Sequence, residues 1–148
     1  MTKQELANFI DQTLLSQEAT EEQVEKFCQQ AKEYGFASVC INPVFVSTAT
    51  KILSGSQTNV CTVIDFPLGA GGTESKMSQA DIAITNGADE LDFVIDLNLV
   101  KSKKWNELTQ QLSFLTKSVQ EASMFAEKDG LPRKGKVLTK LILETTLL

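Results

Sequence analysis

The 148-residue sequence predicts an α/β fold in which parallel strands alternate with helices along the chain. Two observations support this prediction. Short runs of almost uninterrupted apolar residues recur, which is typical of strands buried on both faces of a parallel sheet. Between these runs, apolar residues recur at helical spacing, and glycine or proline marks the boundaries. We expect five strands in one domain, residues 1–148.

The first three strands are expected at residues 9–11, 36–41 and 59–65. A short N-terminal helix precedes the first of them. The helix between the first and second strands is expected to begin after Thr20, because Thr20 and Gln23 have the spacing of a capping box.

The rest of the chain continues the alternation. In order, the remaining elements are helices at about 44–53 and 73–86, a strand at 90–97, a helix at about 105–125, a polar loop at 127–135 and a strand at 136–143. Thr73 is placed to cap the second of these helices. We expect the long helix to pack its apolar stripe in the core, and the stripe consists of Leu108, Leu112, Leu115 and Val119.

The composition excludes several classes of function. Lys and Arg number 14 and Asp and Glu 19, so the net charge of -5 repels nucleic-acid phosphates. The absence of histidine excludes histidine-based triads and histidine metal ligands. Cys28, Cys40 and Cys61 form no CxxC pair, so we expect reduced thiols and a cytoplasmic location. No segment has the length and hydropathy of a secretion signal or a membrane span.

Charged residues inside apolar runs are the strongest candidates for chemistry. Active groups in parallel α/β folds gather at the C-terminal ends of strands. By this criterion the candidates are Asp11, Cys40, Asn42, Asp65, Asp92, Asp96, Lys140 and Glu144. Asp92 and Lys140 stand out because burying a charge is costly unless it is paired or used. They predict a proton-transfer couple, with a structural salt bridge or a solvent-facing register as the alternatives.

Three weaker features each have two interpretations. Asp11 either belongs to a site or caps a turn or helix. Cys40 is either a reactive thiol or a small buried apolar residue. The loop at 69–72 either holds a phosphate group or is a simple turn, and it matches neither the dinucleotide nor the P-loop motif.

The chain ends at residues 143–148, directly after the last predicted strand. A parallel strand is normally followed by a helix that covers it, and a chain terminus tends to be polar, whereas these residues are mostly apolar. We therefore expect the chain to be cut short, with a natural edge strand at the C-terminus as the alternative.

Five segments, taken in order, resemble deoxyribose-phosphate aldolases. They are residues 9–15, 39–43, 62–69, 87–95 and 136–145. The resemblance implies a (β/α)8 TIM barrel and a class I aldolase that uses a lysine Schiff base without a metal or other cofactor. The reaction it implies is the cleavage of 2-deoxy-D-ribose 5-phosphate to glyceraldehyde 3-phosphate and acetaldehyde. A complete barrel needs about 250 residues, so this chain corresponds to about the first five βα units.

The resemblance also implies roles for individual residues. Asp92 matches the proton-relay carboxylate of the family, and Lys140 matches its lysine partner on the fifth strand. Asp11 and Cys40 match residues near the substrate. The Schiff-base lysine and the phosphate-binding loops of the family belong to strands six to eight, so we expect this chain alone to be inactive. Two departures concern the pocket, namely Gln12 in place of the usual histidine and Asp96 in place of a frequent asparagine.

Two alternatives remain beside the aldolase interpretation. One is a catalytically inactive fragment or module that buries its open edges against another copy. The other is an open, doubly wound nucleotide-binding domain. The expected partners are a phosphosugar substrate in the complete enzyme and further copies of the chain, with no nucleic acid and no membrane.

Overall fold

The computed structural model describes residues 1–128 and 135–148, and its centre is a sheet of five parallel strands. The strands are β1 (Asp11–Leu14), β2 (Ser38–Ile41), β3 (Asn59–Ile64), β4 (Glu90–Val94) and β5 (Leu138–Ile142). They lie in the sheet in chain order, so each strand pairs with the one before it. A doubly wound sheet instead reverses direction at a switch point. The predicted α/β fold is confirmed, and the doubly wound alternative is wrong.

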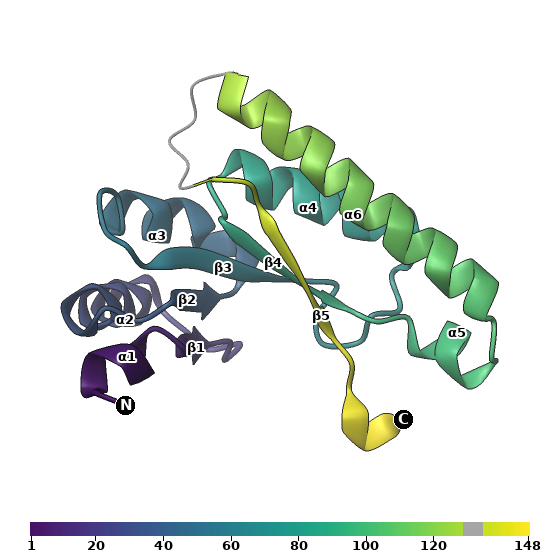
Figure 1. The fold of residues 1–148 in the computed structure, drawn as a ribbon, viewed down its shortest axis with the longest axis horizontal. Coiled ribbons are helices and arrows are strands. Elements are labelled where there is room, and N and C mark those ends of the chain that lie inside the picture. Colours follow the sequence, from purple (N-terminus) through teal and green to yellow (C-terminus); the bar gives the residue numbers. More distant parts are fainter. Residues whose placement is uncertain (129–134) are drawn as a thin grey trace.

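Helices connect the strands. They are α1 (Lys3–Ala7), α2 (Glu21–Tyr34), α3 (Val46–Ile52), α4 (Gly72–Thr85), α5 (Leu97–Lys101) and α6 (Trp105–Lys128), with 3-10 turns η1 (Pro43–Phe45) and η2 (Thr145–Leu147). Figure 1 shows α3, α4 and α6 along one face of the sheet. As predicted, Thr20 and Gln23 form the capping box of α2. Among the described residues, no helix combines the length and the hydropathy that a membrane span requires.

The two faces of the sheet carry different side chains. Alternate residues of a strand point to opposite faces. On one face, Ile41, Ile64 and Phe93 pack in the main core against apolar residues of the helices. The predicted stripe of α6 contributes Leu115 and Val119 to that core. The opposite face, which we call the inner face, carries a smaller apolar cluster of Cys40, Cys61 and Val63 and, beside it, the charged residues of β4 and β5.

The first strand lies later than predicted, and the two ranges share only Asp11. The amides of Phe9 and Ile10 donate to the carbonyls of Leu6 and Ala7, so these residues belong to the turn that ends α1. The apolar character of Phe9 and Ile10 indicated a strand, whereas their backbone groups complete the helix end.

Thr73 does not cap α4. The helix begins at Gly72, and its N-cap residue, Gly71, has no side chain that could cap it. The amide of Gly71 instead donates to the Asp65 carboxylate at 2.8 Å. The hydroxyl of Thr73 accepts a hydrogen bond of 3.0 Å from Gln111 on α6.

The strand predicted at 90–97 ends at Val94, and the sequence-based prediction lacks the helix α5 that follows. Asp96 caps α5, because its carboxylate accepts from the Leu99 amide at 3.1 Å. Aspartate and asparagine are equally good N-caps, which explains why either residue suits position 96. The predicted loop at 127–135 overlaps the end of α6 and otherwise lies mostly outside the described residues.

A buried ion pair holds the loop between β3 and α4. Lys76, on α4, has 1% of its side chain exposed and pairs with Asp65, which directly follows β3. The Lys76 ammonium also donates to the carbonyls of Gly69, at 2.8 Å, and Val94, at 3.0 Å. These contacts join the loop to the C-terminal end of β4.

Candidate active site

A lysine and three carboxylates meet on the inner face of the sheet. The Nζ atom of Lys140 lies 3.0 Å from an Asp11 oxygen, 3.0 Å from a Glu90 oxygen and 3.2 Å from Asp92 Oδ1. The four residues come from β1, β4 and β5. Three negative charges therefore surround one positive charge, which leaves the group with an excess of negative charge.

The strand register explains how these side chains meet. Asp92 and Lys140 are direct partners on β4 and β5, so their side chains leave the sheet on the same face. Glu90 lies two residues before Asp92, and residues at this spacing share a face. Asp11 lies on β1, at the opposite edge of the sheet from β5. Lys140 reaches it because the sheet curves, as the wall of a barrel does.

Neighbouring polar groups hold two of the carboxylates in place. The Ser38 hydroxyl donates to Asp11 at 2.7 Å, and the Asn59 amide donates to Glu90 at 2.8 Å. Glu90 is almost fully buried, with 6% of its surface exposed. Buried carboxylates are stable only when such donors surround them.

The surroundings keep Lys140 charged. Burial by itself lowers the pKa of Lys140, but the carboxylates of Glu90, Asp11 and Asp92 outweigh burial and raise the pKa above its ordinary value. Burial by itself raises the pKa of Asp11. Hydrogen bonds from Ser38 and Lys140 lower this pKa by more than burial raises it, so the pKa of Asp11 lies below its ordinary value. At neutral pH the group therefore contains an ammonium ion and not a free amine.

Two thiols lie next to the charged group. Cys40 and Cys61 are partners on β2 and β3, and both are buried. The Lys140 Nζ atom lies 3.7 Å from the Cys61 sulfur. The hydrogen bond with Cys40 and then burial raise the pKa of Cys61 far above its ordinary value, so Cys61 is a neutral thiol. An oxygen of Asp92 and the sulfurs of Cys40 and Cys61 lie within 4.8 Å of one another, which makes them possible metal ligands.

The structure brings together the four residues proposed as site residues from the sequence. The expected proximity of Asp92 and Lys140 is confirmed by their distance, and Asp11 and Cys40 lie beside them. Asp11 starts β1 and caps no helix, which corrects both its placement at a strand end and its interpretation as a cap. Sequence reasoning missed Glu90, although its spacing of two residues from Asp92 on one strand could have indicated it.

The other candidates at strand ends do not join the group. Asp65 pairs with Lys76, Asp96 caps α5, and the Asn42 amide donates to the Ser16 carbonyl at 3.1 Å. Glu144 follows β5 and precedes η2. Parallel strands supply a site only where their side chains share the inner face, and Asp65, Asp96 and Asn42 have structural contacts elsewhere.

Two uncertain features of the pocket have structural explanations. In the loop at 69–72, the amides of Gly69 and Gly71 donate to the backbone and side chain of Asp65, so these donors are already used within the protein. The Gln12 amide donates to Gln30 on α2 at 3.1 Å. Gln12 therefore faces the helices and does not reach the inner face.

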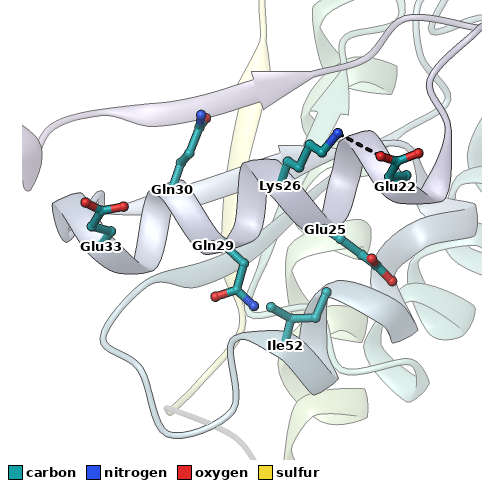
Figure 2. A pocket seen from close by; sticks show the side chains of 7 residues that line it. All are labelled: Glu22, Glu25, Lys26, Gln29, Gln30, Glu33 and Ile52. Carbon is teal, nitrogen blue, oxygen red and sulfur yellow. Dashed lines mark hydrogen bonds and ion pairs between the residues drawn. The ribbon is translucent and has the colours of Figure 1, made fainter.

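A hollow of about 640 Å³ beside α2 is a weaker candidate for a site. Charged and amide side chains of α2 line it, together with Ile52 of α3. Figure 2 shows that these side chains point in different directions and do not converge on one position; Lys26 pairs with Glu22 on its own helix. A binding site needs polar groups that converge, so the group around Lys140 is the better candidate.

Comparisons with known proteins agree with this geometry. Residues 6–134 match the model of the DeoC/LacD family aldolases. Deoxyribose-phosphate aldolase from Clostridium kluyveri is 43% identical over 148 residues, which are 100% of this chain and 62% of that protein. A solved structure from Coccidioides immitis, assigned as a deoxyribose-phosphate aldolase, has a TM-score of 0.81 at 35% identity, and the match covers 100% of this chain and 53% of that one.

The deoxyribose phosphate aldolase from Aeropyrum pernix, described as a tetramer, has a TM-score of 0.70 at 30% identity, covering 99% of this chain and 56% of that one. The chain thus spans less than two thirds of the length of the proteins that it matches.

Proposed function

The chain belongs to the DeoC/LacD family of aldolases, and from this premise we propose that it forms the first five βα units of a deoxyribose-phosphate aldolase barrel. The proposed reaction is the cleavage of 2-deoxy-D-ribose 5-phosphate to glyceraldehyde 3-phosphate and acetaldehyde. The observation that carries this proposal is the contact of Lys140 with Asp11, Glu90 and Asp92 on the inner face. In this proposal residues 1–148 are one partial barrel domain.

The protonation state of Lys140 defines which step it can serve. A lysine that forms a Schiff base must attack as a neutral amine, and burial or a nearby cation lowers its pKa for this purpose. The contacts of Lys140 have the opposite effect and raise its pKa. Lys140 therefore serves as a proton-holding partner and not as the nucleophile, in agreement with its match to the fifth-strand lysine of the family.

Asp92 is the proposed proton carrier. Its carboxylate contacts the Lys140 ammonium, and 17% of its side chain is exposed on the open side of the sheet. A carboxylate and an ammonium group in contact can take up a proton from a substrate carbon or hydroxyl group and return it. Asp11 and Glu90 also pair with Lys140, and Cys40 lies close to Asp92.

The nucleophile is expected from the remaining part of the barrel. In the family it lies on strands six to eight, so we propose that this chain alone has no aldolase activity. The assay is cleavage of 2-deoxy-D-ribose 5-phosphate, combined with borohydride trapping of a Schiff base. Turnover with a trapped adduct on this chain alone would contradict the proposal.

Complementation tests the proposal that this chain supplies the first five βα units of an active aldolase barrel. The chain is mixed with, or fused to, the C-terminal portion of one of the curated relatives, beginning where the match with this chain ends. We expect aldolase activity from the combination. Asp92→Asn in this chain is expected to lower kcat more than it raises KM, because the carboxylate acts in the chemical step. Unchanged turnover would remove Asp92 from the mechanism.

A second candidate is an inactive module that associates with itself. It is supported by the exposed apolar side chains on and after β5, namely Leu138, Leu143, Leu147 and Leu148. If this chain and the C-terminal portion of a relative assemble into a folded complex that has no aldolase activity, the result would favour the inactive module over the aldolase function.

A further inference from the structure

We propose that Glu90 is the positioning residue that prevents Lys140 from reacting with aldehydes as a free amine. The Lys140 ammonium lies 3.0 Å from Glu90 Oε2, and Glu90 is 6% exposed. The inference rests on the proposed function, in which an aldehyde is released beside Lys140 while another lysine forms the Schiff base. In this role Glu90 acts through Lys140 and does not touch the substrate.

The step that Glu90 prevents is the attack of an amine on an aldehyde. The lone pair of a neutral amine attacks the aldehyde carbon, a C–N bond forms, and the carbonyl oxygen leaves as water with the two amine protons. An ammonium group has no free lone pair and cannot take this step. Lys140 is 31% exposed, so a small aldehyde can reach its Nζ atom. Its charge, and not its burial, therefore has to keep it unreactive.

Two donors hold the Glu90 carboxylate in a fixed position. Asn59 on β3 donates to Glu90 Oε1 at 2.8 Å, while the Lys140 ammonium contacts Glu90 Oε2. Each carboxylate oxygen therefore has its own partner, as a buried carboxylate requires. Asn59 lies two residues before Cys61, which is the direct strand partner of Glu90, so these side chains share the inner face.

The pairing of β4 with β5 brings Lys140 to Glu90 and Asp92 together. Asp92 is the direct partner of Lys140, and Glu90 is the partner of Leu138, two residues before Lys140. The ammonium group contacts Glu90 at 3.0 Å and Asp92 at 3.2 Å. Lys140 can therefore keep its contact with Glu90 while Asp92 exchanges a proton with a substrate.

Glu90 is better suited to this role than the other two carboxylates. Asp92 is the proposed proton carrier, so it loses its negative charge whenever it holds a proton. Asp11 is 42% exposed, so water screens its charge. The Glu90 side chain is 8% exposed, and the attraction between charges is stronger where water is excluded. Burial lowers the pKa of Lys140, and Glu90 raises it at least as much as either of the other carboxylates.

The first test is reductive alkylation of the folded, unaltered chain with acetaldehyde and cyanoborohydride, followed by peptide mass mapping. Cyanoborohydride delivers hydride to the imine carbon and so converts each imine to an N-ethyl lysine. Lys26, which is 69% exposed, is the internal reference. We expect alkylation of Lys140 to be at least about tenfold slower than that of Lys26, because each pKa unit changes the amine fraction about tenfold. Equal rates would overturn the proposal.

The second test compares two glutamate variants. Glu90→Gln is expected to raise the alkylation of Lys140 relative to Lys26 by about tenfold, because it removes a contact between charged groups and hardly changes the side-chain shape. The matched control is Glu107→Gln, which removes an exposed carboxylate that pairs with Lys104 and is expected to leave Lys140 unchanged. If Lys140 is as unreactive in a folded Glu90→Gln chain as in the control, the proposal is wrong.

Asn59→Ala decides the question if Glu90→Gln loses its near-ultraviolet circular dichroism and so does not fold. This variant keeps the charge of Glu90 but frees one of its oxygens, so we expect a smaller rise in the alkylation of Lys140. A folded Asn59→Ala chain without any rise over the control would overturn the proposal.

These measurements need no aldolase turnover, so their result is separate from that of the complementation experiment. An active combination whose Lys140 is alkylated as fast as Lys26 would reject this inference alone. An inactive combination in which only Glu90→Gln makes Lys140 reactive would reject the proposed function alone.

Discussion

Lys76 shows how strongly a single residue can hold a loop in this protein. Its ammonium group is buried and is balanced by Asp65 and two backbone carbonyls. We expect Lys76→Met to lower the free energy of unfolding by about 3–5 kcal/mol, because it leaves a carboxylate buried without its partner. Urea denaturation measures this change.

Two variants serve as controls for Lys76→Met. Lys26→Met removes an exposed ion pair with Glu22 and is expected to have a much smaller effect. The double variant Lys76→Met with Asp65→Asn is expected to recover part of the lost stability, because no unpaired charge remains. A double variant that is less stable than Lys76→Met would contradict this explanation.

Asp11 leads to a prediction about pH. Its pKa in the folded chain lies below the ordinary value of 3.8, so the folded state favours the charged form. The resulting stability is present above the ordinary pKa and is lost as the pH falls through the lowered pKa. Asp11→Asn is therefore expected to destabilise the chain near neutral pH by about 1 kcal/mol or less, since Asp11 is partly exposed.

In acid, the same substitution is expected to have a much smaller effect. The measurement is the free energy of unfolding of the two chains from neutral to acidic pH. A difference that stays constant over this range would show that the charge of Asp11 contributes nothing.

At this scale the sequence predicts part of the site. Asp92 and Lys140 are recognisable because a charge within an apolar run is unusual. Glu90 is recognisable only from its spacing of two residues from Asp92, because a polar residue at the start of a strand is ordinary. The contact between Asp11 and Lys140 spans 129 positions and depends on the curvature of the sheet, which local sequence patterns do not contain.

At the scale of single elements, the loop between β3 and α4 leaves no space for a side chain at Gly69. Its φ of +67° is unfavourable for other residues, and an added Cβ would lie 2.3 Å from the Ile95 carbonyl oxygen. Gly69→Ala is expected to destabilise the chain by several kcal/mol, because strain and a backbone clash add together. Gly55→Ala is the matched control, with a φ of +73° and no neighbouring atom within 4 Å.

The control is expected to cost about 1–2 kcal/mol, which is the conformational strain alone. Thermal unfolding of the two variants compares them directly. Equal losses of stability would show that the contact between the loop and the end of β4 does not restrict position 69.

The sequence predicts most elements to within two residues, because the strands at 38–41, 59–64 and 138–142 and the helix after Thr20 have strong local signals. The errors occur where residues whose type is typical of one structural role have a different role in the structure. Phe9 and Ile10 are apolar but complete a helix end. Thr73 is a good cap by residue type, but α4 begins one residue earlier and the Thr73 hydroxyl accepts from Gln111. Contacts between distant segments decide these cases.

At the scale of the whole molecule, the open sheet is expected to associate. Within the described residues the sheet has two unpaired edges, at β1 and β5, and Leu138 on β5 is 52% exposed. Exposed strand edges and apolar patches pair readily with other chains. We predict a dimer or larger species at micromolar concentration, which analytical ultracentrifugation can detect.

Substitutions can locate the contact. Leu138→Lys is expected to shift the chain towards the monomer, because a lysine on an edge strand opposes pairing. Ile82→Lys, on the exposed side of α4, is the control and is expected to leave association unchanged. A wild-type chain that sediments as a compact monomer would contradict the prediction.

The order β1-β2-β3-β4-β5 also matters during synthesis of the chain. A ribosome releases the N-terminal part first, at about 5–20 residues per second, and domains begin to fold while synthesis continues. Because every strand pairs with the one made just before it, each βα unit finds a finished edge as soon as it emerges. No strand depends on a partner that is synthesised much later, and each new strand adds to the edge formed by the strand before it. The sheet can therefore assemble in one direction during translation. At each stage its last strand offers the backbone hydrogen-bonding groups with which the next strand pairs.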